Sequence, residues 1–223
     1  MKGIKNIIIV AGLLTLNSHS VFGKSLSFGP SVGHWGSTGG TLEISLLDLH
    51  KNFPLGFILG AGYFNQSNPG NAEDARKIFI NDNTGGVIQE EGNIYIGFFD
   101  VTYPIYKTKG FAFRITAGPR YVKHIADFAF LGDNEVFAIT SAAYGAGSSI
   151  RLDFDLSKYF LLKFSTGYDI FQKTQLGGHG EFYYEPDSTD DNPRGDYTYA
   201  DADEAIFQPD KYFRILLGVE YRF

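Results

Sequence analysis

The last ten residues of the chain, RILLGVEYRF, separate into two sets when every second residue is taken, and one set is wholly apolar or aromatic. Every second position from Ile215 to Phe223 is apolar or aromatic, whereas the other set, from Arg214 to Arg222, includes two arginines and a glutamate. A period of two places successive side chains on opposite faces of a β-strand, whereas a helix repeats about every 3.6 residues. The chain therefore ends in a strand that has one wholly apolar face.

The same alternation recurs in other parts of the chain. Three upstream segments repeat it clearly, at 111–123, 143–155 and 160–173. Four more segments alternate less regularly and predict strands at about 25–36, 40–49, 55–66 and 93–104. In the last of these, three inward positions are apolar as well and blur the register: Ile94, Ile96 and Phe98. With the C-terminal segment at 213–223, the sequence predicts eight strands.

The composition excludes several classes of function. The chain has no cysteine, so a disulfide framework, a zinc-thiolate site and a thiol nucleophile are all excluded. Its net charge of −6 gives no general affinity for nucleic acid, which binds basic patches. The sequence contains no phosphate-binding P-loop, no dinucleotide fingerprint and no HExxH motif. The glycine-rich stretch GAGSSI, residues 145–150, lies inside an alternating segment and is interpreted as part of a strand.

The first residues have the pattern of a targeting segment. Lys2 and Lys5 precede an apolar run at 7–16, and small and polar residues follow it. This order predicts a secretory signal peptide at 1–23, cleaved near its end, because an apolar run of ten residues is too short to span a bilayer. The mature chain, 24–223, is then one β domain.

The connections between the predicted strands fall into two series. Short, lysine-containing turns lie at 50–54, 104–110 and 155–160. The other series has one short member, 36–40, and three longer members, 66–92, 124–136 and 174–210. Short turns at one end and longer loops at the other, joining an even number of antiparallel strands, are typical of a transmembrane β-barrel.

The face opposite the apolar side chains carries charges of both signs. We expect these residues to point into the barrel: Glu43, Asp100, Arg114, Arg120, Arg151, Asp153, Lys163, Asp169, Arg214, Glu220 and Arg222. An eight-stranded barrel has an interior just wide enough for side chains, so six cations and five anions there would pair with one another. We therefore expect the apolar face to contact lipid and the lumen to be filled by an ion-pair network, with a narrow gated conduit as the alternative.

A secretory signal, eight such strands and a last strand ending in EYRF resemble the small bacterial outer-membrane barrels, the group of the OmpA membrane domain, OmpX, OmpW and the Ail-type proteins. The resemblance implies a closed, all-β, up-and-down barrel in the outer membrane, with both termini in the periplasm and with lipid and lipopolysaccharide around it. Val219, Tyr221 and Phe223 resemble the family signal that the outer-membrane insertion machinery reads.

The connection at 174–210 is strongly acidic, with ten carboxylates against Arg194. The simplest interpretation is a solvated surface loop, and its interleaved tyrosines suit contacts with an extracellular protein. The sharper hypothesis is a calcium site, because calcium prefers carboxylate and carbonyl oxygens. Its ligands would be Asp201, Asp203 and Glu204, or else Asp187, Asp190 and Asp191. Neither run has the glycine that an EF-hand loop needs at its turn. Apart from this calcium ion, we expect no cofactor.

Two histidines bear on the question of catalysis. Barrel enzymes that modify lipid A use a histidine with a serine near the membrane surface. His34, with Ser37 and Thr38 nearby, and His124 are expected near the outer rim, where a non-catalytic role is favoured. Trp35, the only tryptophan, is expected to anchor the barrel at the membrane interface.

These observations rank three functions. The first is a non-enzymatic surface protein whose extracellular loops contact a ligand or a host. The second is a narrow channel for small hydrophobic molecules, as the resemblance to OmpW implies. The third is an enzyme that modifies lipid A.

Overall fold

The computed structural model describes residues 26–49, 54–83, 85–132, 134–178, 183–186 and 196–223. The predicted signal peptide and the acidic set Asp187, Asp190 and Asp191 lie outside the described residues. Within the described part, no helix has the length and the apolar composition that crossing a membrane requires.

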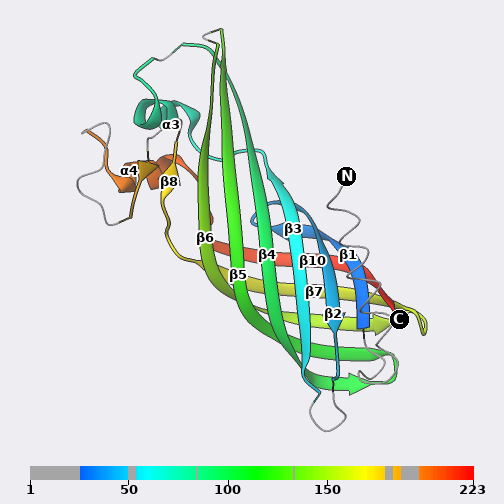
Figure 1. The fold of residues 1–223 in the computed structure, drawn as a ribbon. Helices are drawn as coiled ribbons and strands as arrows, with labels where there is room; N and C mark the ends of the chain where they lie inside the picture. The colour runs from blue at the N-terminus through cyan, green and yellow to red at the C-terminus, as the bar shows by residue number, and fades with distance from the viewer. Residues whose placement is uncertain (1–25, 50–53, 84, 133, 179–182, 187–195) are drawn as a thin grey trace, which may run out of the picture.

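Eight long strands in the described part pair in chain order into a closed antiparallel barrel, which confirms the predicted fold class (Figure 1). The barrel closes where the first strand pairs with the last, for example through Val32 and Leu217. The strands are β1 (Leu26–Trp35), β2 (Thr38–Leu46), β3 (Gly56–Gln66), β4 (Val87–Thr108), β5 (Phe111–Leu131), β6 (Glu135–Asp155), β7 (Phe160–Phe171) and β10 (Lys211–Arg222).

The side chains of β10 show the orientation of the two faces. Leu217 and Val219 are exposed on the outside, whereas Arg214 and Glu220 are buried in the lumen. The apolar face of the strand therefore points outward and the charged face inward. In a soluble barrel this arrangement would be reversed, so the outer face is one that suits hydrocarbon.

Aromatic residues and polar contacts mark the outer edge of the apolar band. Tyrosine rings pack in cross-strand pairs on the outer face: Tyr63 with Tyr95 at 5.4 Å, and Tyr121 with Tyr144 at 5.3 Å between centroids. One step further along the strands, the outer face becomes polar, and Asn65 Nδ2 donates to Glu91 Oε1 at 2.8 Å. Aromatic girdles of this kind lie at the boundary between hydrocarbon and headgroups.

A second aromatic belt lies at the other end of the barrel. It includes the pairs Phe111 with Phe154, at 5.0 Å, and Phe160 with Tyr221, at 5.5 Å between centroids. Beyond it, Arg222 Nη2 lies 2.6 Å from Asp155 Oδ1. Along β5, the apolar band thus runs from Phe111 to Tyr121, which is close to the length that a tilted transmembrane strand needs.

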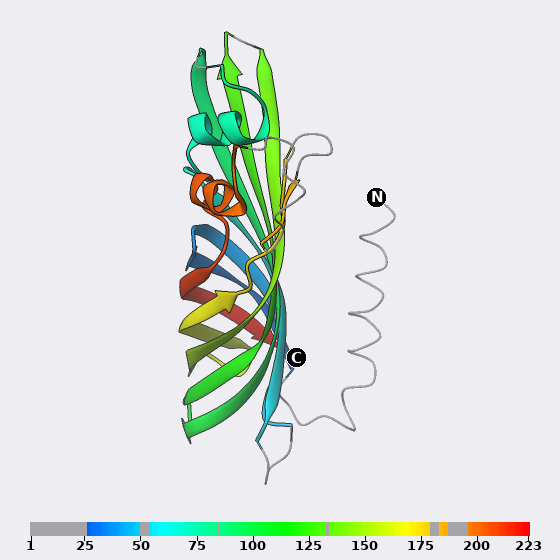
Figure 2. The same cartoon turned by 90° about the vertical axis from the view of Figure 1, so that its left-hand side faces the viewer.

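The prediction of a loop at 124–136 is wrong, because the two flanking strands extend through most of this segment. β5 runs on to Leu131 and β6 starts at Glu135, so each strand has 21 residues. β4 likewise starts at Val87, inside the connection predicted at 66–92. The parts of these strands above the outer tyrosines, residues 87–93, 122–131 and 135–143, form a three-stranded extension that we call the blade (Figure 2).

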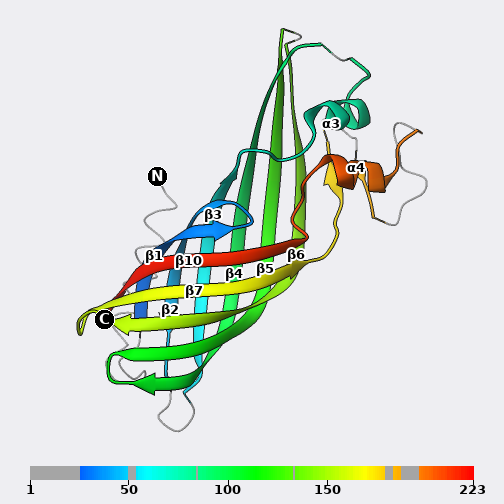
Figure 3. The same cartoon turned by 180° about the vertical axis from the view of Figure 1, so that it is seen from behind.

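Two short helices pack against the inner face of the blade, and a small hairpin continues the sheet at its β6 edge, where Gly177 pairs with Thr140. They are α3 (Ala72–Phe79), α4 (Tyr199–Ala205), β8 (Leu176–Gly177) and β9 (Tyr183–Tyr184), which together we call the cap. Figures 2 and 3 show α3 and α4 beside the blade, one above the other. The cap and the blade share a core of buried residues, which includes Ala75, Phe79, Phe128, Phe137, Leu176, Tyr184, Ala202 and Ile206. The protein thus has a second core, beyond the barrel.

The local sequence explains both helices. At the start of α3, the Asn71 side chain accepts a hydrogen bond from the Asp74 backbone N–H, and at the start of α4 Thr198 and Asp201 form a capping box. The two long connections are also joined to each other, because Asn71 N donates to Ala205 O at 2.7 Å and Phe207 N donates to Pro69 O at 2.9 Å. The cap is therefore one packed unit.

Candidate functional site

Ten of the eleven charged residues expected in the lumen are buried there, and the eleventh, Arg222, lies at the rim beside Asp155. The larger of two networks centres on Glu220. Lys163 Nζ lies 3.0 Å from Glu220 Oε1 and 2.6 Å from Glu43 Oε2, and Arg151 Nη2 lies 2.9 Å from Glu220 Oε2. Asp153 links Arg151 to Arg114, at 2.6 Å and 2.9 Å. Each charge in this network therefore has a direct partner.

The second network centres on Arg120. Its Nη1 lies 2.6 Å from Asp100 Oδ1 and its Nε lies 2.7 Å from Asp169 Oδ1. Arg214 is less well paired, since its Nε lies 3.8 Å from Asp169 Oδ2. The Arg214 guanidinium instead lies over the ring of Trp35, 4.3 Å from the centroid. Arg120 thus contacts two buried carboxylates directly, whereas the nearest carboxylate oxygen of Arg214 lies farther away, on Asp169.

Above the ion pairs, the lumen is filled by apolar side chains. Trp35 is fully buried there and packs against Phe64 and Phe98, with centroids 5.9 Å and 5.3 Å away. The expectation that Trp35 anchors the barrel at the interface is therefore wrong. Glycine makes room for this layer, because a Cβ at Gly60 would lie 2.2 Å from the Phe98 ring. The inward apolar residues of β4 that blurred its register belong to the same layer.

Little empty space is left between the two layers. A cavity of about 20 Å³ is lined by residues of both, among them Glu43, Asp100, Lys163, Arg214 and Leu216. A volume of this size holds about one water molecule. The lumen between the two layers is therefore filled by side chains, whereas a larger space of about 150 Å³ lies at one mouth of the barrel, beside Asp48, Lys107 and Arg114.

At the end of the barrel that has the short turns, Arg114 also binds Asp48, with Nη1 and Nη2 each 3.0 Å from Oδ1, and Lys107 forms a further ion pair with Asp48. Burial raises the pKa of the Asp48 carboxyl, but the hydrogen bonds from Arg114 and Lys107 outweigh burial and hold its pKa below the ordinary value. Asp48 therefore stabilises the folded barrel at neutral pH.

The lowered pKa of Asp48 predicts a pH dependence. A carboxyl whose pKa is lower in the folded state contributes stability above its ordinary pKa of 3.8, and that contribution is lost as the pH falls through the folded value. We expect Asp48→Asn to lose less stability than the wild type between neutral pH and about pH 3. Denaturant unfolding in vesicles at both pH values measures this difference. Equal losses in the two proteins would show that Asp48 does not contribute.

The two histidines occupy different environments. His124 lies just above the outer tyrosine belt, near the expected rim, but its side chain points inward and is buried, with Nε2 3.0 Å from Gln66 Oε1. Burial lowers the pKa of His124 to about 4, so it is neutral at physiological pH. His34 is exposed on the outer face of β1, and the Ser37 hydroxyl donates to the Asn65 carbonyl. Among the residues that the structure describes, no hydrogen bond joins a histidine to a serine or threonine hydroxyl.

The acidic residues proposed for calcium have other partners in the cap. Asp201 accepts hydrogen bonds from the Thr198 hydroxyl and backbone N–H, and these bonds lower its pKa. Asp203 pairs with Lys173 at 2.6 Å, and Glu204 is exposed. Within the described ranges, no three acidic or histidine side chains converge on one point. The calcium hypothesis stays a prediction, which a calorimetric titration with calcium tests.

One arginine holds the cap against the blade. Arg76 of α3 is completely buried; its Nε donates to Glu135 Oε2 at 2.6 Å and its Nη1 to the Gly85 carbonyl at 2.8 Å. The guanidinium also lies over the Phe130 ring, 4.2 Å from its centroid. Asn81 Nδ2 donates to the other oxygen of Glu135 at 2.8 Å. These contacts fix α3 to the tip of the blade.

The tip of the blade is apolar and its edge is unpaired. Val87, Leu131 and Val136 are 67%, 48% and 71% exposed on its outer face. The pairing of β3 with β4 ends at Gln66 and Gly92, so in the described part of the chain residues 87–91 of β4 pair with β5 alone. The backbone of this edge is free to bond to another strand. Sequence reasoning missed this feature because it did not predict the blade.

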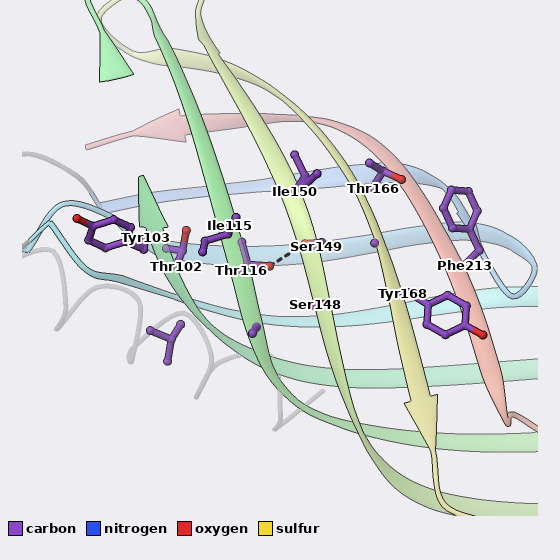
Figure 4. Close-up of a pocket in the computed structure, with 13 residues that line it drawn as sticks. Thr102, Tyr103, Ile115, Thr116, Ser148, Ser149, Ile150, Thr166, Tyr168 and Phe213 are labelled. Atoms are coloured by element: carbon purple, nitrogen blue, oxygen red, sulfur yellow. Dashed lines mark hydrogen bonds between the residues drawn. The ribbon is translucent and has the colours of Figure 1, made fainter. Parts of the chain in front are cut away.

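A groove lies on the lipid-facing side of the barrel, over β4 to β7 and β10 (Figure 4). It is a depression open to the surroundings of the barrel, with a volume of about 730 Å³. The small residues Ala117 and Ser148 form the floor, and larger side chains border it: Tyr103, Ile115, Ile150, Tyr168 and Phe213. None of the residues that line the groove is charged.

Comparison with known proteins supports the fold. No protein-family model matches the chain, and no curated protein matches it. A major outer membrane protein from Thermus thermophilus has a similar structure, with a TM-score of 0.73 and 21% identity, over 89% of this chain and 98% of that one. At this identity the likeness shows a shared fold.

Two other solved structures are less similar. Ail, the attachment invasion locus protein of Yersinia pestis, was solved in complex with the heparin analogue sucrose octasulfate. It matches with a TM-score of 0.46 and 14% identity, over 89% of this chain and 97% of that one. Neisserial surface protein A matches with a TM-score of 0.40 and 11% identity, over 89% of this chain and 94% of that one.

The fold, the outward apolar band and the two aromatic belts together support a location in the bacterial outer membrane. The short turns, the start of β1 and the end of β10 all lie at one end of the barrel. In proteins of this architecture, that end is periplasmic. The blade and the cap then project outside the cell.

Proposed function

We propose that this chain is an integral outer-membrane surface protein that recognises an extracellular partner through its blade and cap, without carrying out catalysis. The observation that carries the proposal is the free edge of β4 at residues 87–91, next to the exposed aliphatic tip. Both features lie on the most distant part of the protein from the membrane, where another molecule can reach them.

The unpaired edge suits a partner with an extended segment. Natural proteins usually cover or blunt such edges, because exposed N–H and C=O groups recruit another strand. A partner strand would form main-chain hydrogen bonds with β4, and its alternate side chains would give specificity. Glu90 and Glu91 lie on the same edge, so a segment that carries lysine or arginine beside apolar residues fits it best. The cap packs against the blade and stabilises its strands, so that their edge is presented to a partner in a fixed conformation.

The filled lumen argues against the second candidate, a narrow conduit. Both the ion-pair networks and the apolar layer around Trp35 block the described lumen. We expect the purified protein to give no steady conductance steps in planar bilayers, because eight strands leave room only for side chains. Reproducible unitary steps from protein that migrates as folded on unboiled gels would favour the conduit instead.

The C-terminal residues fit a role in assembly. Val219, Tyr221 and Phe223 lie on the outer face of the last strand or at its end, exposed to the surroundings of the barrel. We propose that the insertion machinery reads these three side chains, because they are accessible before the barrel closes against β1. This step delivers the protein to the membrane and is separate from recognition outside the cell.

The recognition proposal can be tested with one surface variant and a matched control. We expect vesicles that carry the wild-type protein to bind at least one member of a panel of immobilised serum and extracellular-matrix proteins. Serine at Val87, Leu131 and Val136 together should abolish this binding. Phe207→Ser removes an exposed apolar side chain elsewhere and should retain it. Equal binding by the triple variant, or no binding by the wild type above that of empty vesicles, would contradict the proposal.

A further inference from the structure

The lipid-facing groove is built by a local change in side-chain size. Val101, Ala117, Ser148, Tyr168 and Phe213 form one row of cross-strand neighbours on the outer face, and the two small members, Ala117 and Ser148, lie between larger ones. The outer surface is therefore depressed over β5 and β6 and raised on either side. Figure 4 shows Tyr103 on one flank, Tyr168 and Phe213 on the other.

The groove is closed at its periplasmic end and continues toward the outer end. On the periplasmic side of the floor, Ile115 and Ile150 are cross-strand partners, and both project outward. On the other side, the next outward pair is Pro119 with Ala146, so small side chains continue toward the outer aromatic belt. An occupant therefore enters from the outer half of the membrane.

We propose that this groove binds one acyl chain of an outer-leaflet lipid. Apart from the border at Ile115 and Ile150, it opens onto the surface that contacts hydrocarbon, and its lining has no charged side chain to pair with a charged headgroup. If the depression were empty, the side chains that line it would lose dispersion contacts. In a membrane, where the hydrophobic effect gives no driving force, such packing contacts favour the association of a lipid chain with the protein. The inference depends on the orientation of the barrel and is independent of the proposed recognition function.

A second copy of the chain fits the groove less well. Two closed barrels are both convex, so a neighbouring barrel could place only single side chains in the groove. A flexible hydrocarbon chain can follow it from the outer aromatic belt down to Ile115 and Ile150. An acyl chain therefore makes the larger number of contacts.

Native mass spectrometry of the detergent-solubilised, folded protein mixed with lipid A tests this inference. We expect the wild type to retain one lipid A molecule at collision energies that strip the other lipids. Ser148→Phe fills the floor and should lose the retained molecule, whereas Ala61→Phe adds the same side chain to the outward face of β3 and should keep it. If Ser148→Phe does not fold, Ala117→Leu serves in its place.

The outcomes separate the alternatives. Equal retention by the wild type and both variants would overturn the groove as a site. Equal retention of phosphatidylethanolamine and lipid A by the wild type would overturn the assignment to the outer leaflet. A dimer that appears in the wild type and is lost only in Ser148→Phe would overturn the acyl-chain assignment, because a second copy would then be the occupant.

Discussion

Replacing Arg120 by methionine is expected to lower the free energy of unfolding by about 3–5 kcal/mol, the usual cost of breaking a buried ion pair. Arg120 is buried in the lumen and contacts both Asp100 and Asp169, which are buried as well. Methionine fills a similar volume but leaves two carboxylates without their cation. The cost therefore comes from uncompensated charge rather than from lost packing.

The matched control for this prediction is Arg214→Met. Arg214 lies in the same lumen, but its nearest carboxylate oxygen is 3.8 Å away and belongs to Asp169, which keeps Arg120 as a partner. We therefore expect a much smaller loss of stability for Arg214→Met. Denaturant unfolding of both variants in the same vesicles measures the difference. Equal destabilisation would show that the central role assigned to Arg120 is wrong.

Replacing Arg76 by methionine is expected to loosen the cap while the barrel stays folded. Arg76 donates charged hydrogen bonds to Glu135 and to the Gly85 carbonyl, and bonds of this kind contribute about 1.5–3 kcal/mol each. The barrel below has its own ion pairs and a closed ring of strands. We therefore expect proteases to cut the connection between β3 and β4 much faster, with unchanged heat-modifiable migration of the barrel.

The control for the cap is Lys173→Met. The ion pair of Lys173 with Asp203 lies at the surface, where such pairs contribute little, so protease resistance should be close to that of the wild type. Loss of barrel migration in Arg76→Met would mean that cap and barrel fold as one unit. Unchanged resistance to proteases in that variant would mean that Arg76 does not hold the cap.

The alternation of the strands was sufficient to predict the barrel and the side of it that faces lipid. In β10, polar and apolar positions separate almost completely, because one face meets hydrocarbon and the other meets buried charge. The same rule failed for the blade. Above Tyr121 the apolar residues of β5, such as Phe128 and Phe130, point inward to the cap core. Most apolar residues of β5 thus face outward below Tyr121 and inward above it. Because the alternation is interrupted at this point, the sequence predicted a loop where the strand continues.

The sequence contains N-capping patterns for both helices, which an analysis of strand periodicity does not detect. Asn71 precedes a segment in which Ala72, Ala75 and Phe79 recur at helical spacing, and Thr198 stands three residues before Asp201. The position of Trp35 could not be predicted in the same way. Whether it faces lipid or lumen depends on the register of β1 against β2 and β10, and tertiary pairing decides that register.

The central claim, that the apolar face contacts hydrocarbon while the charged face fills the lumen, is tested most directly along β10. The chain has no cysteine, so single cysteines can be placed at 215, 216, 217 and 219 without a background reaction. In bilayers, we predict that spin labels at Ile215, Leu217 and Val219 collide readily with oxygen and rarely with a water-soluble nickel complex. A cysteine at Leu216, which is buried in the lumen, should resist labelling in the folded barrel. Ready access of the nickel complex to the three outward positions, or labelling of position 216 as complete as theirs, would contradict the account.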